Sequence, residues 1–465
     1  MQRRMLVLLI AAGFALAGCG GGGGGSSPSA TTIGSSTGAT GGTSTGTGSG
    51  SGSGATTTGS SGSGGSGSGG SSGSGGSGSG ASATETVLYS FGANGSSDGS
   101  EPSGALVMDS SGNLYGTTGL GGTNNTGTVF EWSAGAGEHV LYSFGAQGGT
   151  DGYPPNGGLI IDPSGNLVGT TQEGGAGNAL PVPDGFGTVF SVNSAGTETL
   201  LHSFIGQQAP FDATQPFSGL VMNPSGDLFG TGSSGGANGS GAVYEIHSAG
   251  QESVLYSFGS NGSGDGQNPY AGLILDSSGD LFGVTSGGGA DGSGTVFEIK
   301  PGGAESVLYS FGTAGPGDGT VPVGALSMDS AGNLYGATQY GGANGTGTIF
   351  ELTSSGSEKI LHSFGPSAGS DGVSPSGNLL INAAGDIFGT TSSGGSGRLV
   401  ASGGGVVFEI TPSGSYSVLY RFGQNGGADA VGPSGGLIED ASGNLYGVTG
   451  GGGLHGLGAI YEITP

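Results

Sequence analysis

The chain has very little positive charge and almost no cysteine. Its 465 residues include 6 Lys and Arg against 32 Asp and Glu, which gives a formal net charge of −26. This negative field disfavours nucleic acid and other polyanions as partners, and leaves solubility or the attraction of cations as its uses. Cys19 is the only cysteine. No disulfide bond within the chain can therefore stabilise the fold.

Residues 1–18 have the pattern of a secretory signal. Two arginines precede an apolar run at residues 5–16, which is too short for a spanning helix. The segment Leu16-Ala-Gly-Cys19 resembles the lipobox of bacterial lipoproteins, and this resemblance implies cleavage before Cys19 and lipid attachment to it. We therefore predict an exported protein, lipid-anchored to the bacterial membrane at the outer membrane or cell surface. A plain cleaved signal with an incidental cysteine is the alternative.

Residues 19–82 are predicted to be a disordered linker. After Cys19 they are almost entirely Gly, Ser, Thr and Ala, and none of them is charged. Such a composition cannot bury an apolar core. A flexible coil of this length spans about 40 to 45 Å. The remaining residues, 83–465, are predicted to form one folded domain.

Seven near-copies of one unit fill this domain. Residues 324–364 show the unit most clearly, with four short runs rich in β-branched and aromatic residues that are separated by turn residues. The Phe that closes the fourth run recurs at intervals of 53 to 60 residues, a period typical of repeat architectures. Its copies are Phe91, Phe144, Phe204, Phe258, Phe311, Phe364 and Phe422.

The repeats predict a closed ring of sheets. A single four-stranded sheet of this size cannot cover both of its faces, and the radial packing of such sheets is the β-propeller. The array starts with a strand of the fourth kind at residues 86–91 and ends with a strand of the third kind at residues 458–463. We therefore predict an all-β, seven-bladed propeller of four-stranded antiparallel blades, in which the N-terminal strand closes the last blade.

The repeated motifs VLYSFG, DxxGNLYGTT and GGANGxGTVFEI resemble the GloVer tandem-repeat family over about residues 86–465. Members of that family are exported bacterial proteins whose repeat region is joined to differing surface anchors. The resemblance implies a cell-surface repeat domain, here with a lipoprotein anchor. It brings no established activity, so it implies no catalytic residue.

An Asp-x-x-x-Pro motif follows the fourth strand of every repeat. In a propeller we expect this loop close to the central channel, where a ring of carboxylates could bind Ca²⁺ or polar sugars. The simpler interpretation is that each Asp caps backbone N–H groups of its own turn. Apart from this Ca²⁺ alternative, no cofactor is expected. The aspartates are Asp98, Asp151, Asp212, Asp265, Asp318, Asp371 and Asp429.

The histidines are predicted to be packing or surface residues. His202 and His362 stand where the other five repeats carry a tyrosine in the fourth strand, and no spacing brings two histidines together for a metal. The sequence also shows no nucleophile with a base and no GxSxG motif. It therefore carries no hydrolase signature.

Three loops break the repeat and are the predicted places of function. Residues 172–187, 205–217 and 392–405 are longer than or different from their counterparts. Exposed aromatics beside carboxylates and amides suit carbohydrate or peptide binding, whereas neutral growth of tolerant loops is the alternative. The candidate binding residues are Glu173, Asp184, Phe186, Phe211, Asp212 and Arg398.

Three functions remain open. The first is a monomeric, lipid-anchored, surface-exposed propeller that binds a glycan, peptide or protein partner through its loop face. The second is a propeller lyase or hydrolase of glycans that uses acidic residues at the channel mouth. The first, innermost strands of the seven repeats are nearly uniform in sequence, and Glu439 is the one extra acidic residue among them. The third is a structural or adhesive module without a saturable ligand.

Overall fold

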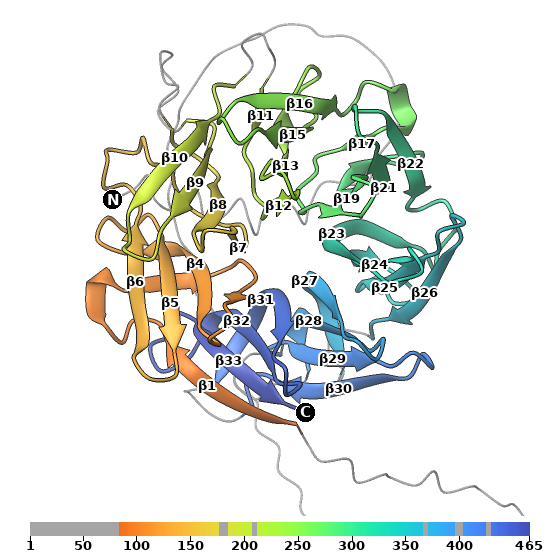
Figure 1. Ribbon diagram of the computed structural model, residues 1–465. Coiled ribbons are helices and arrows are strands. Elements are labelled where there is room, and N and C mark those ends of the chain that lie inside the picture. The colour runs from red at the N-terminus through yellow and green to blue at the C-terminus, as the bar shows by residue number, and fades with distance from the viewer. Residues whose placement is uncertain (1–82, 176–184, 207–211, 366–370, 396–402, 425–428) are drawn as a thin grey trace, which may run out of the picture. The chain divides into compact units, whose positions relative to one another are not determined.

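The computed structural model describes residues 83–175, 185–206, 212–365, 371–395, 403–424 and 429–465. They belong to one compact unit, Ser77–Pro465. Their architecture is a ring of seven antiparallel sheets, which we number as blades 1 to 7 (Figure 1).

Each blade runs from an innermost to an outermost strand. Blade 1 contains β2 (Gly99–Pro102) and β3 (Val107–Met108), both paired with β4 (Leu114–Gly121), then β5 (Thr128–Ser133) and β6 (Gly137–Ser143). Blade 2 contains β7 (Ile160–Ile161), β8 (Leu167–Thr171), β9 (Thr188–Val192) and β10 (Glu198–Ser203). Blade 3 contains β12 (Val221–Met222), β13 (Leu228–Gly232), β15 (Ala242–Ile246) and β16 (Glu252–Ser257). Blade 4 contains β18 (Ile274–Leu275), β19 (Leu281–Thr285), β21 (Thr295–Ile299) and β22 (Glu305–Ser310).

Blades 5 to 7 have longer inner strands. Blade 5 contains β23 (Gly319–Met328), β24 (Leu334–Gly341), β25 (Thr348–Leu352) and β26 (Glu358–Ser363). Blade 6 contains β27 (Gly372–Ile381), β28 (Ile387–Gly394), β29 (Val406–Ile410) and β30 (Tyr416–Arg421). Blade 7 contains β31 (Ala430–Glu439), β32 (Leu445–Gly452), β33 (Ala459–Thr464) and β1 (Thr84–Ser90). Two short pairs, β11 (Ala213–Thr214) with β14 (Ser234–Gly235) and β17 (Gly266–Gln267) with β20 (Gly287–Gly288), extend blades 3 and 4, and short 3-10 turns lie at Gly95–Ser97 and Gly262–Gly264.

The first strand of the propeller closes the ring. β1 pairs antiparallel with β33, and the register joins Val87 to Tyr461 and Ser90 to Ala459. In Figure 1, β1 lies along the outer edge of blade 7. The predicted seven-bladed propeller with closure by the N-terminal strand is therefore confirmed.

Buried aromatic pairs join each blade to the next. Phe91, which follows the outermost strand of blade 7, meets Phe130 of blade 1 edge to face at a centroid distance of 5.2 Å. Gly116 lies opposite Phe130 in the sheet, and a Cβ at that glycine would come within 2.6 Å of the ring. The repeated Phe and the Gly of the second strand therefore serve the same packing unit. The seven pairs are Phe91–Phe130, Phe144–Phe190, Phe204–Tyr244, Phe258–Phe297, Phe311–Phe350, Phe364–Phe408 and Phe422–Tyr461.

The inner strands pack with their backbones almost in contact. A Cβ at Gly104 would lie 2.6 Å from the carbonyl oxygen of Gly157, and a Cβ at Gly157 would lie 2.6 Å from that of Ser218. Buried hydroxyl groups also form hydrogen bonds between neighbouring blades in this inner layer. Thr117 donates to the Gly157 carbonyl at 3.1 Å, and Thr170 donates to the Ser218 carbonyl at 2.9 Å. Close packing of the inner layer therefore depends on small residues.

Candidate functional site

We name each interface between neighbouring blades a junction by its two blade numbers. A polar cluster lies at the outer strands of every junction. At junction 7/1, the Tyr89 hydroxyl donates to Asp98 at 2.7 Å, and the backbone N–H groups of Gly92 and Gly99 donate to the same carboxylate at 2.7 and 2.8 Å. Asp98 thus caps its own turn, and it also receives a bond from the outermost strand of blade 7.

The repeated aspartates do not surround the channel, so that prediction is wrong. Each loop starts at an outermost strand, and its Asp comes before the segment that returns to the next inner strand. The carboxylate therefore stays with the Tyr or His of the outer strand, as in the bonds from Tyr142 to Asp151 at 2.8 Å and from Tyr256 to Asp265 at 2.8 Å. These aspartates supply no acidic ring at the channel mouth.

A second carboxyl faces the aspartate at six junctions. It belongs to a Glu near the start of the next outer strand, such as Glu138 opposite Asp98. Burial, reinforced by the charge of the facing aspartate, raises the pKa of Glu85, Glu138 and Glu358 to about 7. The same causes raise the pKa of Glu198 and Glu305. Two acids that share a small buried space favour a bound proton.

Junction 5/6 replaces this acid with a tyrosine. The Tyr416 hydroxyl donates to Asp371 at 2.6 Å, and its ring stacks on His362 at a centroid distance of 3.7 Å. His362 Nε2 lies 3.1 Å from the other oxygen of Asp371. Burial opposes ionisation here, yet the bonds from His362 and Tyr416 lower the pKa of Asp371. This junction holds one ionised carboxylate and no pair of acids.

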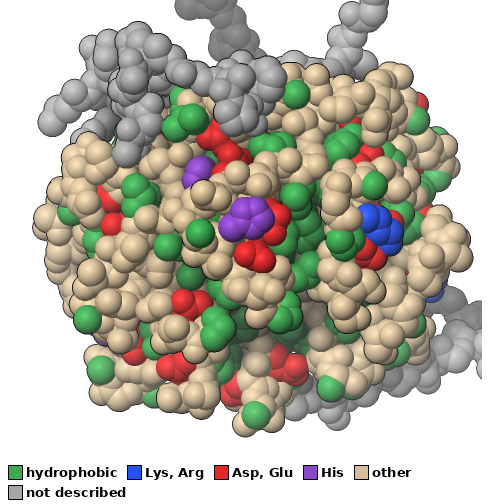
Figure 2. All heavy atoms as spheres, turned by 45° about the horizontal axis from the view of Figure 1, so that its top comes forward, with side chains coloured by type: hydrophobic (Ala, Val, Ile, Leu, Met, Phe, Trp, Pro, Cys, Tyr) green, Lys and Arg blue, Asp and Glu red, His purple; other side chains and the backbone are tan. Residues whose placement is uncertain are grey.

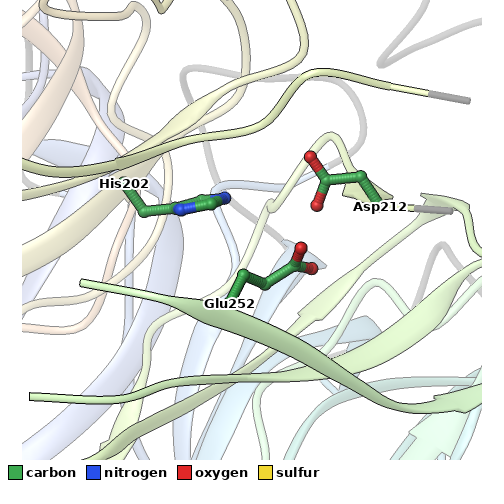
Figure 3. A group of neighbouring side chains, drawn as sticks. All are labelled: His202, Asp212 and Glu252. Atoms are coloured by element: carbon green, nitrogen blue, oxygen red, sulfur yellow. The ribbon is translucent and has the colours of Figure 1, made fainter. Parts of the chain in front are cut away.

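Junction 2/3 brings together His202, Asp212 and Glu252 (Figure 3). One ligand atom from each lies within 4.8 Å of the others. Asp212 is only 3% exposed, and one of its oxygens accepts the N–H of Ile205 at 2.6 Å. The N–H of Ala213 donates to Glu252 at 3.3 Å. Burial lowers the pKa of His202, whereas burial and the neighbouring Asp212 raise the pKa of Glu252 to about 9.

The sequence predicted this cluster only in part. It named Asp212 as a binding candidate and assigned His202 to packing, and the His202 ring does meet Phe204 edge to face at 4.8 Å. It missed Glu252. The available signal was the Glu near the start of the fourth strand, which six of the seven repeats share.

Two of the other candidate binding residues, Glu173 and Phe186, lie in the described part of the chain. Phe186 was predicted to be exposed, but it is half-buried. Its side chain packs against the core between blades 2 and 3, beside Gly206. Glu173 pairs through its backbone with Tyr153 at 2.7 Å. Asp184, Phe211 and Arg398 lie outside the described residues.

The residue before the repeated Pro has an unusual backbone in six repeats. The φ angle is between 53° and 56° at Glu101, Gln215, Asn268, Val321 and Ser374, and 66° at Gly432. In the second repeat this place is taken by Pro154. This left-handed conformation is costly for residues other than glycine. Its N–H bridges the blades, as in the bonds from Glu101 to the Leu457 carbonyl at 2.9 Å and from Asn268 to the Ser240 carbonyl at 2.8 Å.

An aromatic pair lies beside two of these positions, where the chain enters the inner strands of blades 3 and 4. Phe217 and Tyr270 meet edge to face at a centroid distance of 5.3 Å, and Tyr270 is 42% exposed. Gln215 and Asn268 each precede these rings by two residues. We name the four residues the mouth platform. The sequence signal for it was the variation of the residues on either side of an otherwise constant Pro.

A second group with metal-ligand chemistry lies in blade 3, at the hairpin between β12 and β13 and the hairpin between β15 and β16. It consists of Asp227, Glu245 and His247, all half-exposed. Asn223 donates to Asp227 at 3.0 Å, and His247 Nε2 lies 3.2 Å from the Ser253 hydroxyl. These polar atoms are therefore already paired within the hairpins.

The surface carries scattered acids and few bases. On the face shown in Figure 2, acidic side chains occur in small groups and basic ones are sparse. Lys300 contacts Asp280 and Glu298, each at 2.7 Å. Within the described part of the chain, no helix has the length and apolarity needed to cross a bilayer.

The closed ring of repeated four-stranded blades defines a β-propeller built from tandem repeats. A family model described as the Gloeobacter/Verrucomicrobia repeat matches the chain at residues 181–329 and again at 314–465, which is more than half of its length. The chain belongs to this family, which confirms the resemblance found in the sequence. No curated protein matches the chain.

Solved structures show a distant likeness of fold. An inferred gluconolactonase has 15% identity and a TM-score of 0.37, covering 66% of this chain and 87% of its own. A luciferin-regenerating enzyme has 10% identity and a TM-score of 0.40, covering 82% of this chain and 95% of its own. Likenesses at this level do not bear on activity.

Proposed function

We propose that the protein is a lipid-anchored surface propeller that binds a neutral glycan at the mouth platform. The observation that carries this proposal is the aromatic pair of the half-buried Phe217 and the exposed Tyr270, flanked by the amides of Gln215 and Asn268. The mouth platform thus takes the place of the loops at residues 172–187, 205–217 and 392–405 as the expected contact surface. The expected class of ligand is still a glycan.

The chemistry of the platform suits a sugar. The apolar face of a sugar ring packs on aromatic rings, and its hydroxyls pair with side-chain amides. Gln215 accepts one bond from Ser234 at 3.2 Å, and Asn268 donates one to the Ser233 carbonyl at 3.1 Å. A side-chain amide can form up to four hydrogen bonds, so each retains capacity for a ligand.

The backbone around the platform supports a role for its side chains. Glycine would adopt the left-handed conformation at lower cost, and blade 7 does use Gly432 there. Gln215 and Asn268 nevertheless carry side chains at φ 55°. Strained positions that retain side chains are common at binding sites.

The charge of the chain favours a neutral ligand. A formal net charge of −26 repels anionic polymers at a distance. An uncharged glycan meets no such barrier, and its recognition relies on contacts like those of the platform.

Binding to a glycan array tests the proposal, with the full-length protein as the analyte. We expect a neutral oligosaccharide to bind saturably, and Tyr270→Ala and Phe217→Ala each to lower its affinity at least about tenfold, as the loss of an aromatic anchor does. Tyr340→Ala is the matched control, because Tyr340 is a similarly exposed tyrosine, at 38%, elsewhere on the ring. Saturable binding of peptides alone, or glycan binding that both variants retain, would overturn the proposal.

The anchor is tested separately. Lipid attachment at Cys19 would tether the propeller through the linker at residues 19–82. We expect intact mass measurement of the membrane-extracted protein to show an acylated N-terminal cysteine, and Cys19→Ser to release the protein from the membrane fraction. An unmodified wild-type cysteine would contradict this part of the proposal.

A further inference from the structure

Junction 2/3 holds a cluster that glycan binding does not use. We propose that His202, Asp212 and Glu252 bind one divalent transition-metal cation of the Zn²⁺ or Mn²⁺ class. The proposal is independent of the mouth platform, because its residues lie at the outer strands β10 and β16 and at the entry to β11.

The donor set matches such a cation. One imidazole nitrogen and two carboxylates form a mixed set that zinc and other first-row divalent metals accept. The ligand atoms lie within 4.8 Å of one another. Around a metal with bonds of about 2.1 Å, neighbouring ligand atoms are roughly 3 to 3.5 Å apart. Small rotations of the three side chains would therefore close the site, leaving a position for water or another ligand.

Two polar atoms in the cluster lack a hydrogen-bond partner among the described residues. They are His202 Nε2 and one carboxylate oxygen of Asp212, both inaccessible to solvent. Asp212 itself is 97% buried. A buried polar atom without a partner is costly, and a coordinated cation would satisfy both atoms at once.

The second nitrogen of His202 is already engaged. The ring has a hydrogen bond to the backbone of Gly250, and since Nε2 has no partner, Nδ1 carries this bond. Such a bond fixes the tautomer with its lone pair on Nε2, which is the form that ligates metals. The lone pair then lies on the side of Asp212 and Glu252 (Figure 3).

The other junctions show why this one differs. At five of them a tyrosine takes the place of His202, and its hydroxyl donates a proton to the aspartate, as Tyr309 does to Asp318 at 3.1 Å. Junction 5/6 has a histidine, His362, but Tyr416 replaces the second acid. Among the described residues, junction 2/3 alone combines the histidine with both carboxyls. A metal at junction 2/3 would take the place of the proton that the tyrosine hydroxyl shares with the aspartate at those five junctions.

Metal content of the full-length protein provides the test. After treatment with a chelator and dialysis against ZnCl₂, we expect elemental analysis to find about one Zn²⁺ per chain. Co²⁺ should give the visible absorption of a site with few ligands. His202→Tyr restores the common junction and should reduce bound metal at least tenfold, while His247→Asn at the exposed hairpin cluster should leave it unchanged.

The repeats also make the test robust. His202→Tyr is expected to fold, because the same tyrosine is present at five junctions, and circular dichroism in chelator checks this. Glu252→Gln provides a second variant that removes one ligand at nearly constant volume, and it should lose the metal as well. Wild-type protein without bound metal, or equal metal content in the wild type and both junction variants, would overturn the proposal.

Discussion

The propeller is expected to become more stable as the pH falls from 8 to 5, with a rise in melting temperature of at least about 5 °C. Three junction acids, Glu85, Glu138 and Glu358, have a pKa raised from 4.5 to about 7 by burial and by a facing aspartate. A carboxyl with a raised folded-state pKa binds more protons in the folded than in the unfolded chain between these two values. Stability therefore falls as the pH rises through this window, and remains low above pH 7.

Glu138→Gln separates this effect from the general relief of charge repulsion at low pH. Glu138 is 7% exposed and accepts a bond from Asn94 at 3.0 Å, which a glutamine oxygen would also accept. We expect the variant to be about 1 kcal/mol more stable than the wild type at pH 8 and nearly equal to it at pH 5, so that its profile is flatter. Glu409→Gln removes an acid outside the junctions and should keep the wild-type slope.

The measurement is thermal unfolding in chelator across this pH range. Chelator keeps metal binding at junction 2/3 from contributing. A melting temperature that rises from pH 5 to pH 8, or an unchanged slope in Glu138→Gln, would show that the junction acids are not protonated as proposed.

Gly157→Ala is expected to destabilise the propeller by about 1 to 3 kcal/mol, the range for overpacking. Its new methyl group would lie 2.6 Å from the backbone carbonyl of Ser218 in blade 3. A closed ring cannot widen at one junction without disturbing the others, and backbone atoms have no rotamer to change. The strain must therefore spread to neighbouring inner strands.

Gly135→Ala is the matched control, measured by urea denaturation beside Gly157→Ala. Nothing lies within 4 Å of a Cβ at Gly135, and neither glycine has a positive φ, so only the contact differs. The control should change stability by no more than about 0.5 kcal/mol. Equal effects of the two variants would mean that the inner layer is looser than its backbone contacts indicate.

The fold was predictable because its signals repeat. The recurring Phe, now seen in pairs such as Phe91 with Phe130, marks a contact that each blade must make with the next. Strand types at the two ends of the array were enough to predict the pairing of β1 with β33. Local pattern and global closure point to one architecture.

The candidate sites were less predictable because they depend on contacts between repeats. Glu252 and Asp212 belong to different turns of the chain, and only the packing of neighbouring outer strands brings them to His202. The sequence led us to expect the repeated aspartates at the channel. Spacing along a loop that runs from an outermost strand to the next inner strand does not tell which end of the loop a residue lies near. Phe186 looked exposed for a similar reason, since the space beside Gly206 exists only in the folded ring.

The closure of blade 7 also affects the order of folding. β1 is the first strand of the domain to leave the ribosome, whereas β33, its partner, comes from the far end of the sequence. Until then β1 has an open edge and no neighbour, which is the condition that favours association between chains. The unpaired edge of β1 must therefore be protected from other chains for the whole time that the other blades fold.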